Sequence, residues 1–149
     1  MDKDGEEASK GKVNEDLLQQ LDAVPFYTIK GVKSLGKEYV DEYFSFIHSF
    51  PISLADKLCT FNHHIAYQIG QVLSKEEIQG EILLTGGGAF NTYLVLLFSQ
   101  YWPQGCTPVV PSTELVNFKE ALIFSFLAVL HQTGNINVWK SVTGAQTDS

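Results

Sequence analysis

Apolar residues in this sequence recur mainly at helical spacing. The clearest case is the stretch 54–73, where they keep an i, i+3 or i+4 separation that predicts an amphipathic helix. The apolar positions are Leu54, Leu58, Phe61, Ile65, Ile69 and Val72. Ser53, with Asp56 three residues later, forms a variant of the capping box and predicts the start of this helix.

Two further helices are predicted before residue 54. Asn14 can cap a short helix with an apolar face, and Pro25 ends it because the residue before a proline avoids the helical conformation. A second apolar stripe predicts a helix over residues 38–48, and Pro51 interrupts the chain after it.

The segment 81–100 shows two patterns in succession. Residues 82–84 form a short apolar run that predicts a buried strand, near 82–85, and residues 91–101 show helical spacing. Three glycines, Gly86, Gly87 and Gly88, lie between them. A second strand is expected over 107–110, parallel to the first because a helix separates the two. The sequence therefore predicts a mostly helical α/β fold with a short parallel sheet.

A last long helix is predicted over residues 118–132, with Asn117 as its cap and Gly134 after its end. Apolar residues occupy most of its faces, so we expect it to be largely buried. The charged pair Lys119 and Glu120 is the exception, and it either caps the helix in solvent or faces a cleft. The residues after Gly134 are polar and typical of turns.

The glycine turn is the main candidate for a binding site. Glycine has no Cβ, so its backbone can approach a flat ligand, and the next helix directs free N–H groups and a partial positive charge toward the turn. A nucleotide suits such a place, although a tight connection without a ligand gives the same pattern. Residues 86–92 contain no lysine, which excludes a P-loop. Asn91 occupies the sixth position of a dinucleotide fingerprint, so only Glu114, as a ribose-binding acid, keeps that alternative open.

Other candidate sites are weaker. Asp2 and Asp4 are spaced like the start of a calcium loop, but the later ligands are absent, and residues 1–12 are expected to form a solvated segment. His63 and His64 are adjacent on a predicted helix and point about 100° apart, so they cannot share one metal ion. We expect them at the surface or against a partner helix.

The composition limits the classes of function. The chain has 149 residues, enough for one domain, and a net charge of −7 with no basic patch, which argues against binding nucleic acid. Its two cysteines, Cys59 and Cys106, are far apart, as in reduced cytosolic proteins. The N-terminus is not that of a signal peptide, and no apolar run has the length of a membrane span, so we expect a cytoplasmic protein away from membranes.

Six short motifs occur along the chain in a specific order. They are Asp-Lys-Asp-Gly at 2–5 with Ala8 and Gly11, Lys-Ser-Leu-Gly-Lys-Glu at 33–38, Asp56 with Thr60, Gly-Gly-Gly-Ala-Phe-Asn at 86–91, Lys-Glu-Ala at 119–121, and Ser-Val-Thr-Gly-Ala at 141–145. Together they resemble the C-terminal part of the bacterial anhydro-N-acetylmuramic acid kinases.

This resemblance implies an actin-like (ribonuclease H-like) sugar kinase with two domains. Such an enzyme uses ATP and Mg²⁺ to open the 1,6-anhydro ring of anhydro-N-acetylmuramic acid with water and to phosphorylate O6. The products would be N-acetylmuramic acid 6-phosphate, which enters peptidoglycan recycling, and ADP. The resemblance assigns nucleotide contacts to Gly86, Gly87, Gly88 and Asn91, and assigns no catalytic residue or metal ligand to this chain.

The chain departs from the family in one large respect. The family is considerably longer, and its phosphate motif Gly-Thr-Ser-x-Asp-Gly has no counterpart here. We therefore expect residues 1–149 to be a single C-terminal nucleotide-binding subdomain, with the first three strands and the catalytic acid upstream. The expected partners are that missing N-terminal half and, in the complete enzyme, ATP and the anhydro sugar; a homodimer is also compatible. Alone, the chain is expected to be inactive. The alternative is a helical module that binds a nucleotide or a partner without chemistry.

Overall fold

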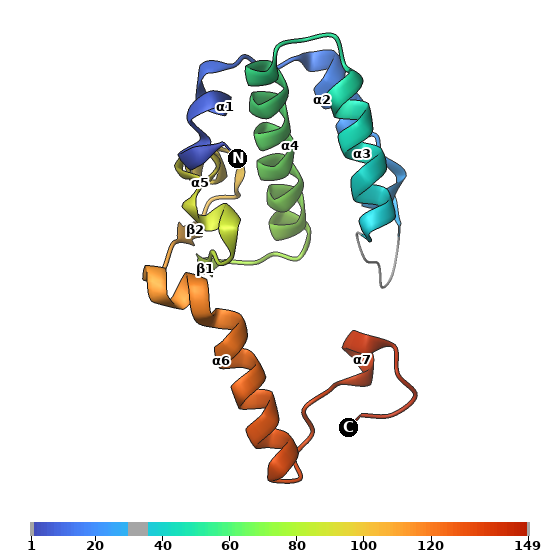
Figure 1. Cartoon of the computed structure of the whole chain (residues 1–149), viewed down its shortest axis with the longest axis vertical. Coiled ribbons are helices and arrows are strands. Elements are labelled where there is room, and N and C mark those ends of the chain that lie inside the picture. The colour runs from blue at the N-terminus through green and yellow to red at the C-terminus, as the bar shows by residue number, and fades with distance from the viewer. Residues whose placement is uncertain (1, 30–35, 149) are drawn as a thin grey trace.

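The computed structural model describes residues 2–29 and 36–148, and its body is organised around one long helix, α4 (Leu54–Lys75). Figure 1 shows α4 in the middle of the body, with helices on two sides and the small sheet at one end. On one side lie α1 (Glu6–Lys10) and α5 (Thr92–Tyr101), and on the other α2 (Glu15–Asp22) and α3 (Lys37–Ser49).

The start of α4 follows the prediction and also anchors the segments before it. The hydroxyl of Ser53 accepts a hydrogen bond from the backbone N–H of Asp56 at 3.1 Å and donates one to its carboxylate at 2.7 Å. The other carboxylate oxygen of Asp56 accepts from the N–H of Lys12 at 2.7 Å. One turn later, the hydroxyl of Thr60 accepts from the N–H of Asn14 at 2.9 Å. The motif residues Asp56 and Thr60 therefore fasten the connection between α1 and α2 onto α4.

The N-terminal segment is ordered and packed, so the expectation of a solvated segment is wrong. It forms a 3₁₀ turn, η1 (Lys3–Gly5), which packs against α5, followed by α1, which packs against α4 and α5. The carboxylate of Asp2 accepts from the N–H groups of Glu7 and Ala8 at 2.9 and 3.1 Å, which satisfies orphan donors of the first turn. Small residues make the contact: Ala8 is fully buried, and Gly5 is buried as well.

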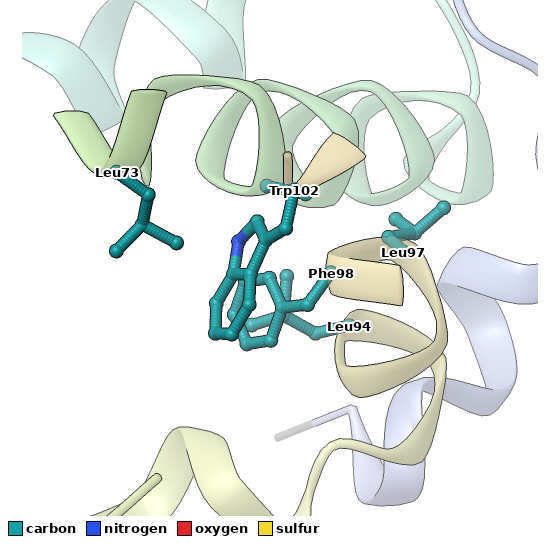
Figure 2. Close-up of a cluster of buried hydrophobic side chains, with 6 residues drawn as sticks. Leu73, Leu94, Leu97, Phe98 and Trp102 are labelled. Atoms are coloured by element: carbon teal, nitrogen blue, oxygen red, sulfur yellow. The ribbon is translucent and has the colours of Figure 1, made fainter. Parts of the chain in front are cut away.

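Two apolar clusters hold the body together. The larger one, between α4 and α5, consists of Ala66, Leu73, Leu94, Leu97, Phe98 and Trp102. Figure 2 shows Trp102 lying over Phe98, with ring centroids 4.6 Å apart and planes at 20°. The smaller cluster joins α2 to α3 through Leu17, Leu21 and Ile47. Asn14 caps α2 as predicted, because its side chain accepts from the N–H of Leu17 at 2.9 Å.

The sheet has two parallel strands, β1 (Gly80–Leu83) and β2 (Cys106–Val109), in the order β1-β2. This confirms the predicted pair, with each strand beginning one or two residues earlier than expected. Glu81 pairs with Thr107, and Leu83, at the end of β1, is 54% exposed. Residues of β1 are mostly exposed, so the expectation of a buried strand is wrong. Side chains of Ile82 and Leu84 pack against the cluster of α4 and α5, and the sheet is otherwise open in the described part of the chain.

The last long helix, α6 (Thr113–Gln132), differs from the prediction in two ways. Its cap is Ser112, whose hydroxyl accepts from the N–H of Leu115 at 3.3 Å, and Asn117 lies inside the helix. It also projects away from the body (Figure 1), so the expected burial is wrong: Phe124, for example, is 69% exposed. The apolar faces exist, but apart from Val116, which is 6% exposed, the described residues leave most of them uncovered. Gly134 follows the helix as predicted, with φ +69°. A short helix, α7 (Lys140–Thr143), replaces part of the turn-like region expected after it.

Candidate functional site

The glycine turn connects β1 to α5 as the sequence indicates. After β1 the backbone N–H of Leu84 still pairs with the carbonyl of Val109 at 2.8 Å, and the chain then turns at Gly86. Gly86 has φ +80°, a conformation that favours glycine. A 3₁₀ turn, η3 (Gly87–Phe90), follows, and the N–H groups of Ala89 and Asn91 close it on the carbonyls of Gly86 and Gly88. The first N–H groups of such a turn have no partner inside it and are available to a ligand.

All three glycines of the turn face open space. A Cβ built on Gly86, Gly87 or Gly88 would meet no other atom of the described chain within 4 Å. Glycines elsewhere are needed for close packing: a Cβ on Gly11 would lie 2.1 Å from the carbonyl oxygen of Ala55, and one on Gly70 2.6 Å from that of Tyr101. Among the described residues, neither packing nor a positive φ requires glycine at 87 and 88, so the turn leaves open space at both positions.

Asn91 is fixed from several sides. Its side-chain oxygen accepts from the N–H of Leu94 at 3.0 Å and so caps α5. Its side-chain amide donates to the side-chain oxygen of Asn62, on α4, at 3.1 Å. The predicted site residues 86–88 and 91 therefore form one unit, in which the glycines are exposed and Asn91 is half-buried beneath them.

A shallow hollow of about 540 Å³ lies beside the turn. Its lining is mainly apolar, with Asp4 as the charged exception: Asp4, Ala89, Phe90, Thr92, Val95, Leu96 and Val110. The N-terminus of α5 begins at this hollow, and its dipole favours negative charge there. An apolar wall beside free N–H groups suits a ligand with a flat ring and an anionic end.

His63 contacts a partner helix, as one of the two expectations for it states. Its ring nitrogens lie 2.8 Å from the hydroxyl of Tyr101 and 3.1 Å from that of Tyr93, both on α5. The hydroxyl of Tyr93 also lies 3.3 Å from the sulfur of Cys59. Burial lowers the pKa of His63 and raises that of Tyr93, because each charged form would lose solvent. The contacts among these side chains join α4 to α5.

His64 also contacts a partner helix, here α2, and it is buried, with 1% exposure, instead of lying at the surface. Its Nδ1 lies 2.6 Å from the carboxylate of Asp22, and its Nε2 lies 2.9 Å from the hydroxyl of Tyr27. A carboxylate only accepts hydrogen bonds, so Nδ1 carries the proton and Nε2 accepts from the tyrosine. Burial lowers the pKa of His64, and Asp22 opposes part of that shift. These hydrogen bonds of His64 connect α2 to α4 on the side away from the glycine turn.

The remaining candidates lie away from the turn. Lys119 is half-buried and Glu120 exposed, and both lie in the second turn of α6 because the helix begins earlier than predicted. Glu114 is exposed in the first turn, where hydrogen bonds from its own N–H and from the hydroxyl of Ser112 lower its pKa. Residues 33–35 of the second motif lie outside the described residues. Gly36 precedes α3, and Lys37 is its first residue.

The described residues show no cluster of three or more His, Cys, Asp or Glu side chains that could hold a metal ion. Within the same residues, no helix is both long enough and apolar enough to cross a bilayer. Sequence reasoning missed Asn62 and the packing role of Gly5. The weak signal for Asn62 was an amide next to two histidines in the middle of an amphipathic helix.

Comparison with known proteins gives a consistent result over the whole chain. The sequence model of the family described as anhydro-N-acetylmuramic acid kinase matches residues 1–149. A curated relative of that name from Caldanaerobacter subterraneus is 33% identical over 97% of this chain and 39% of the relative. One from Shewanella sp. strain W3-18-1 is 30% identical over 99% of this chain and 41% of its own length. One from Saccharophagus degradans is 29% identical with the same two shares. The chain thus spans about two fifths of the length of these relatives.

Proposed function

The chain belongs to the anhydro-N-acetylmuramic acid kinase family, and we propose that it supplies the nucleotide-binding wall of such an enzyme. The reaction proposed is the ATP-dependent conversion of 1,6-anhydro-N-acetylmuramic acid to N-acetylmuramic acid 6-phosphate and ADP, in peptidoglycan recycling. The chain would be the C-terminal subdomain of an actin-like fold, and the location would be the cytoplasm.

The chemistry has two linked parts. Water adds at C1 of the sugar while the bond between C1 and the bridging oxygen breaks, and that oxygen becomes O6. O6 then takes the γ-phosphoryl group of ATP, and ADP leaves. A base must remove a proton from the attacking water, and positive groups must stabilise the charge on the transferred phosphoryl group.

The observation that carries the proposal is the open glycine turn between β1 and α5. Gly87 and Gly88 leave free space and free N–H groups at the ends of parallel strands, which is where ligands of open α/β sheets bind. The hollow beside the turn offers an apolar wall to the adenosine, formed by residues such as Ala89, Val95 and Leu96. The phosphates would then lie toward the turn.

This chain contributes few groups to the reaction beyond the binding of the nucleotide. The described carboxylates do not gather into a metal site, so the residues here do not fit a Mg²⁺ ion. The base, the sugar contacts and the metal ligands would come from another part of the protein. Exposed apolar surfaces support such a partner: Leu83 at the sheet is 54% exposed, and Phe118 and Phe124 on α6 are 66% and 69% exposed. A complete domain would cover these surfaces.

The same exposed surfaces also suit the second candidate, a helical module that binds a nucleotide or another protein without chemistry. The two candidates differ in one outcome. A kinase subdomain forms the sugar phosphate when the complementary part of a family member is present, whereas a binding module does not.

The nucleotide role is tested by replacing Gly87 with valine. Gly87 lies within η3 and does not have a positive φ, unlike Gly86, so valine meets no strain from a positive φ there. The effect of Gly87→Val is instead to fill the space beside the turn.

The protein for this test is a chimera in which this chain replaces the matching region of the Caldanaerobacter relative. We expect Gly87→Val to weaken binding of a non-hydrolysable ATP analogue at least tenfold, measured by calorimetric titration with Mg²⁺. Ser99→Val, on the exposed side of α5, is the matched control and should bind as the parent does. Equal affinity of both variants, with a lower melting temperature for Gly87→Val alone, would make the glycine structural.

A further inference from the structure

We propose that Asn62 is a positioning residue for the glycine turn and acts through Asn91. The inference rests on the proposed nucleotide role of that turn. Asn62 lies in the middle of α4 and is only 6% exposed. A buried amide is costly unless its hydrogen bonds are made, so the groups that Asn62 binds indicate what it does.

Both ends of the Asn62 side chain are used. Its amide donates to the carbonyl oxygen of Leu58, one turn earlier on α4, at 2.8 Å. Its oxygen accepts from the side-chain amide of Asn91 at 3.1 Å. The bond to Leu58 fixes the orientation of Asn62, which leaves its oxygen directed at the start of α5. The central helix of the body is thereby tied to the residue that ends the glycine turn.

Three further hydrogen bonds connect Asn91 to the glycine turn and to the start of α5. Its backbone N–H donates to the carbonyl of Gly88 at 3.1 Å, and this bond closes η3. Its side-chain oxygen accepts from the N–H of Leu94 at 3.0 Å, and its carbonyl from that of Val95 at 3.0 Å. A shift of Asn91 therefore displaces both the glycine turn and the first turn of α5.

A second element holds Asn91 from another direction. Gly5, in the N-terminal segment, lies so close that a Cβ there would be 2.3 Å from the side-chain oxygen of Asn91. The neighbouring hydroxyl of Thr92 donates to the carbonyl of Asp4 at 2.8 Å. Asn91 is thus held between α4 and the N-terminal segment. Asn62 contributes the hydrogen bond from α4, and Gly5 contributes the close packing from the other side.

The consequence for binding is preorganisation. A turn that is already held in one conformation loses little conformational entropy when a ligand binds to its free N–H groups, which strengthens binding. Loss of the bond from Asn62 should loosen the turn while leaving the apolar cluster of α4 and α5 in place. The expected signature is local: faster opening of the turn and weaker nucleotide binding in a protein that stays folded.

The test compares Asn62→Leu with a matched control on the same helix. Thr60→Val also removes a buried hydrogen-bonding group from α4, but Thr60 binds Asn14 and Asp56 on the side of α2. The first measurement is amide hydrogen exchange at Ala89 and Asn91 in this chain, because their N–H groups close the turn. The second is titration of a non-hydrolysable ATP analogue with Mg²⁺ into the chimera defined above.

We expect Asn62→Leu to accelerate exchange at Ala89 and Asn91 about tenfold, the effect of one lost hydrogen bond, and to weaken binding of the analogue by a similar factor. Thr60→Val should change neither by more than about twofold. Similar exchange at the turn in the two variants would overturn the positioning role.

Two further outcomes separate this inference from the proposed function. If Asn62→Leu accelerates exchange at the turn but the parent chimera binds no nucleotide, the positioning role stands and the nucleotide role fails. If the parent binds the analogue and Asn62→Leu binds it equally, with unchanged exchange, the positioning role fails alone. Where Asn62→Leu lowers the melting temperature strongly, exchange at Ala89 and Asn91 is compared with exchange at Trp102, whose N–H donates to the carbonyl of Phe98 in the apolar cluster of α4 and α5. Acceleration at the turn beyond that at Trp102 supports the inference, and equal acceleration at all three amides overturns it.

Discussion

In the body of the molecule, α5 buries Leu94, Leu97 and Phe98 against α4, whereas α6 leaves Phe118, Phe124 and Phe126 60% or more exposed. Both helices are strongly apolar. The difference is that α5 has a partner inside the described chain, and α6 projects from the body without one (Figure 1). An apolar helix therefore indicates that something covers it, but the sequence does not say whether that cover lies in the same chain.

The comparison bears directly on function. The body positions the glycine turn by itself, since α4, α5 and the N-terminal segment all contact Asn91 or its neighbours. The arm, defined here as α6 and α7, carries two of the family motifs, whose residues are exposed apart from the half-buried Lys119. We propose that the complementary part of a complete enzyme docks on the arm and on the sheet, and that the body already has its final form.

The largest expected effect separates a core phenylalanine from an arm phenylalanine. Phe98→Ala should lower the free energy of unfolding by about 3–5 kcal/mol, because it leaves a cavity beneath Trp102. Phe124→Ala should change it by less than about 0.5 kcal/mol, because the ring is already in solvent. Urea denaturation of both variants measures the difference. A loss for Phe124→Ala as large as that for Phe98→Ala would show that the arm packs on the body.

A smaller effect separates packed from open glycines. Gly5→Ala should cost about 1–3 kcal/mol, since Gly5 has φ +76° and a Cβ there would lie 2.3 Å from Asn91. Gly87→Ala should stay within about 0.5 kcal/mol, since nothing in the described chain lies within 4 Å of that position. Thermal melting of the two variants tests this, and a destabilised Gly87→Ala would mean that the turn is packed and not open.

The smallest effect is a pH dependence confined to the body. Burial lowers the pKa of His64, so below the unfolded value of about 6.5 the unfolded chain binds more protons than the folded one. Stability should therefore be full above that pH and fall as pH drops through it, with His63 contributing in the same direction.

The matched variants for this prediction are His64→Gln and His131→Gln. The first should lower the stability and reduce its dependence on pH between 7.5 and 5.5, whereas the second, at an exposed position near the end of α6, should leave that dependence unchanged. Urea midpoints at several pH values provide the measurement. A pH dependence that His64→Gln leaves unaltered would place its origin elsewhere.

Local signals in the sequence were sufficient for much of the body. The cap at Ser53 and the apolar stripe predict α4 to within two residues at its end, and the glycines predict the turn between β1 and α5. These features depend on neighbouring residues only. The start of α6 was misplaced because Ser112 and Asn117 are both good caps, and the choice between them depends on the turn after β2.

The contacts that hold the glycine turn in place could not be predicted from local sequence signals. Asn62 and Asn91 are far apart in sequence, and Gly5 is farther still, so only the packing of α1 and α5 on α4 brings them together. The polar residues 2–5 looked solvated because side-chain polarity says nothing about a backbone that packs through Gly5 and Ala8.

The most direct test of the central claim is an activity measurement with the parts separated. The purified chain is incubated with ATP, Mg²⁺ and anhydro-N-acetylmuramic acid, alone and together with the separately expressed complementary part of the Caldanaerobacter relative. We expect no sugar phosphate from either part alone and N-acetylmuramic acid 6-phosphate when the two are mixed, because this chain would supply the nucleotide wall and its partner the base and metal ligands. Sugar phosphate formed by this chain alone would contradict the account.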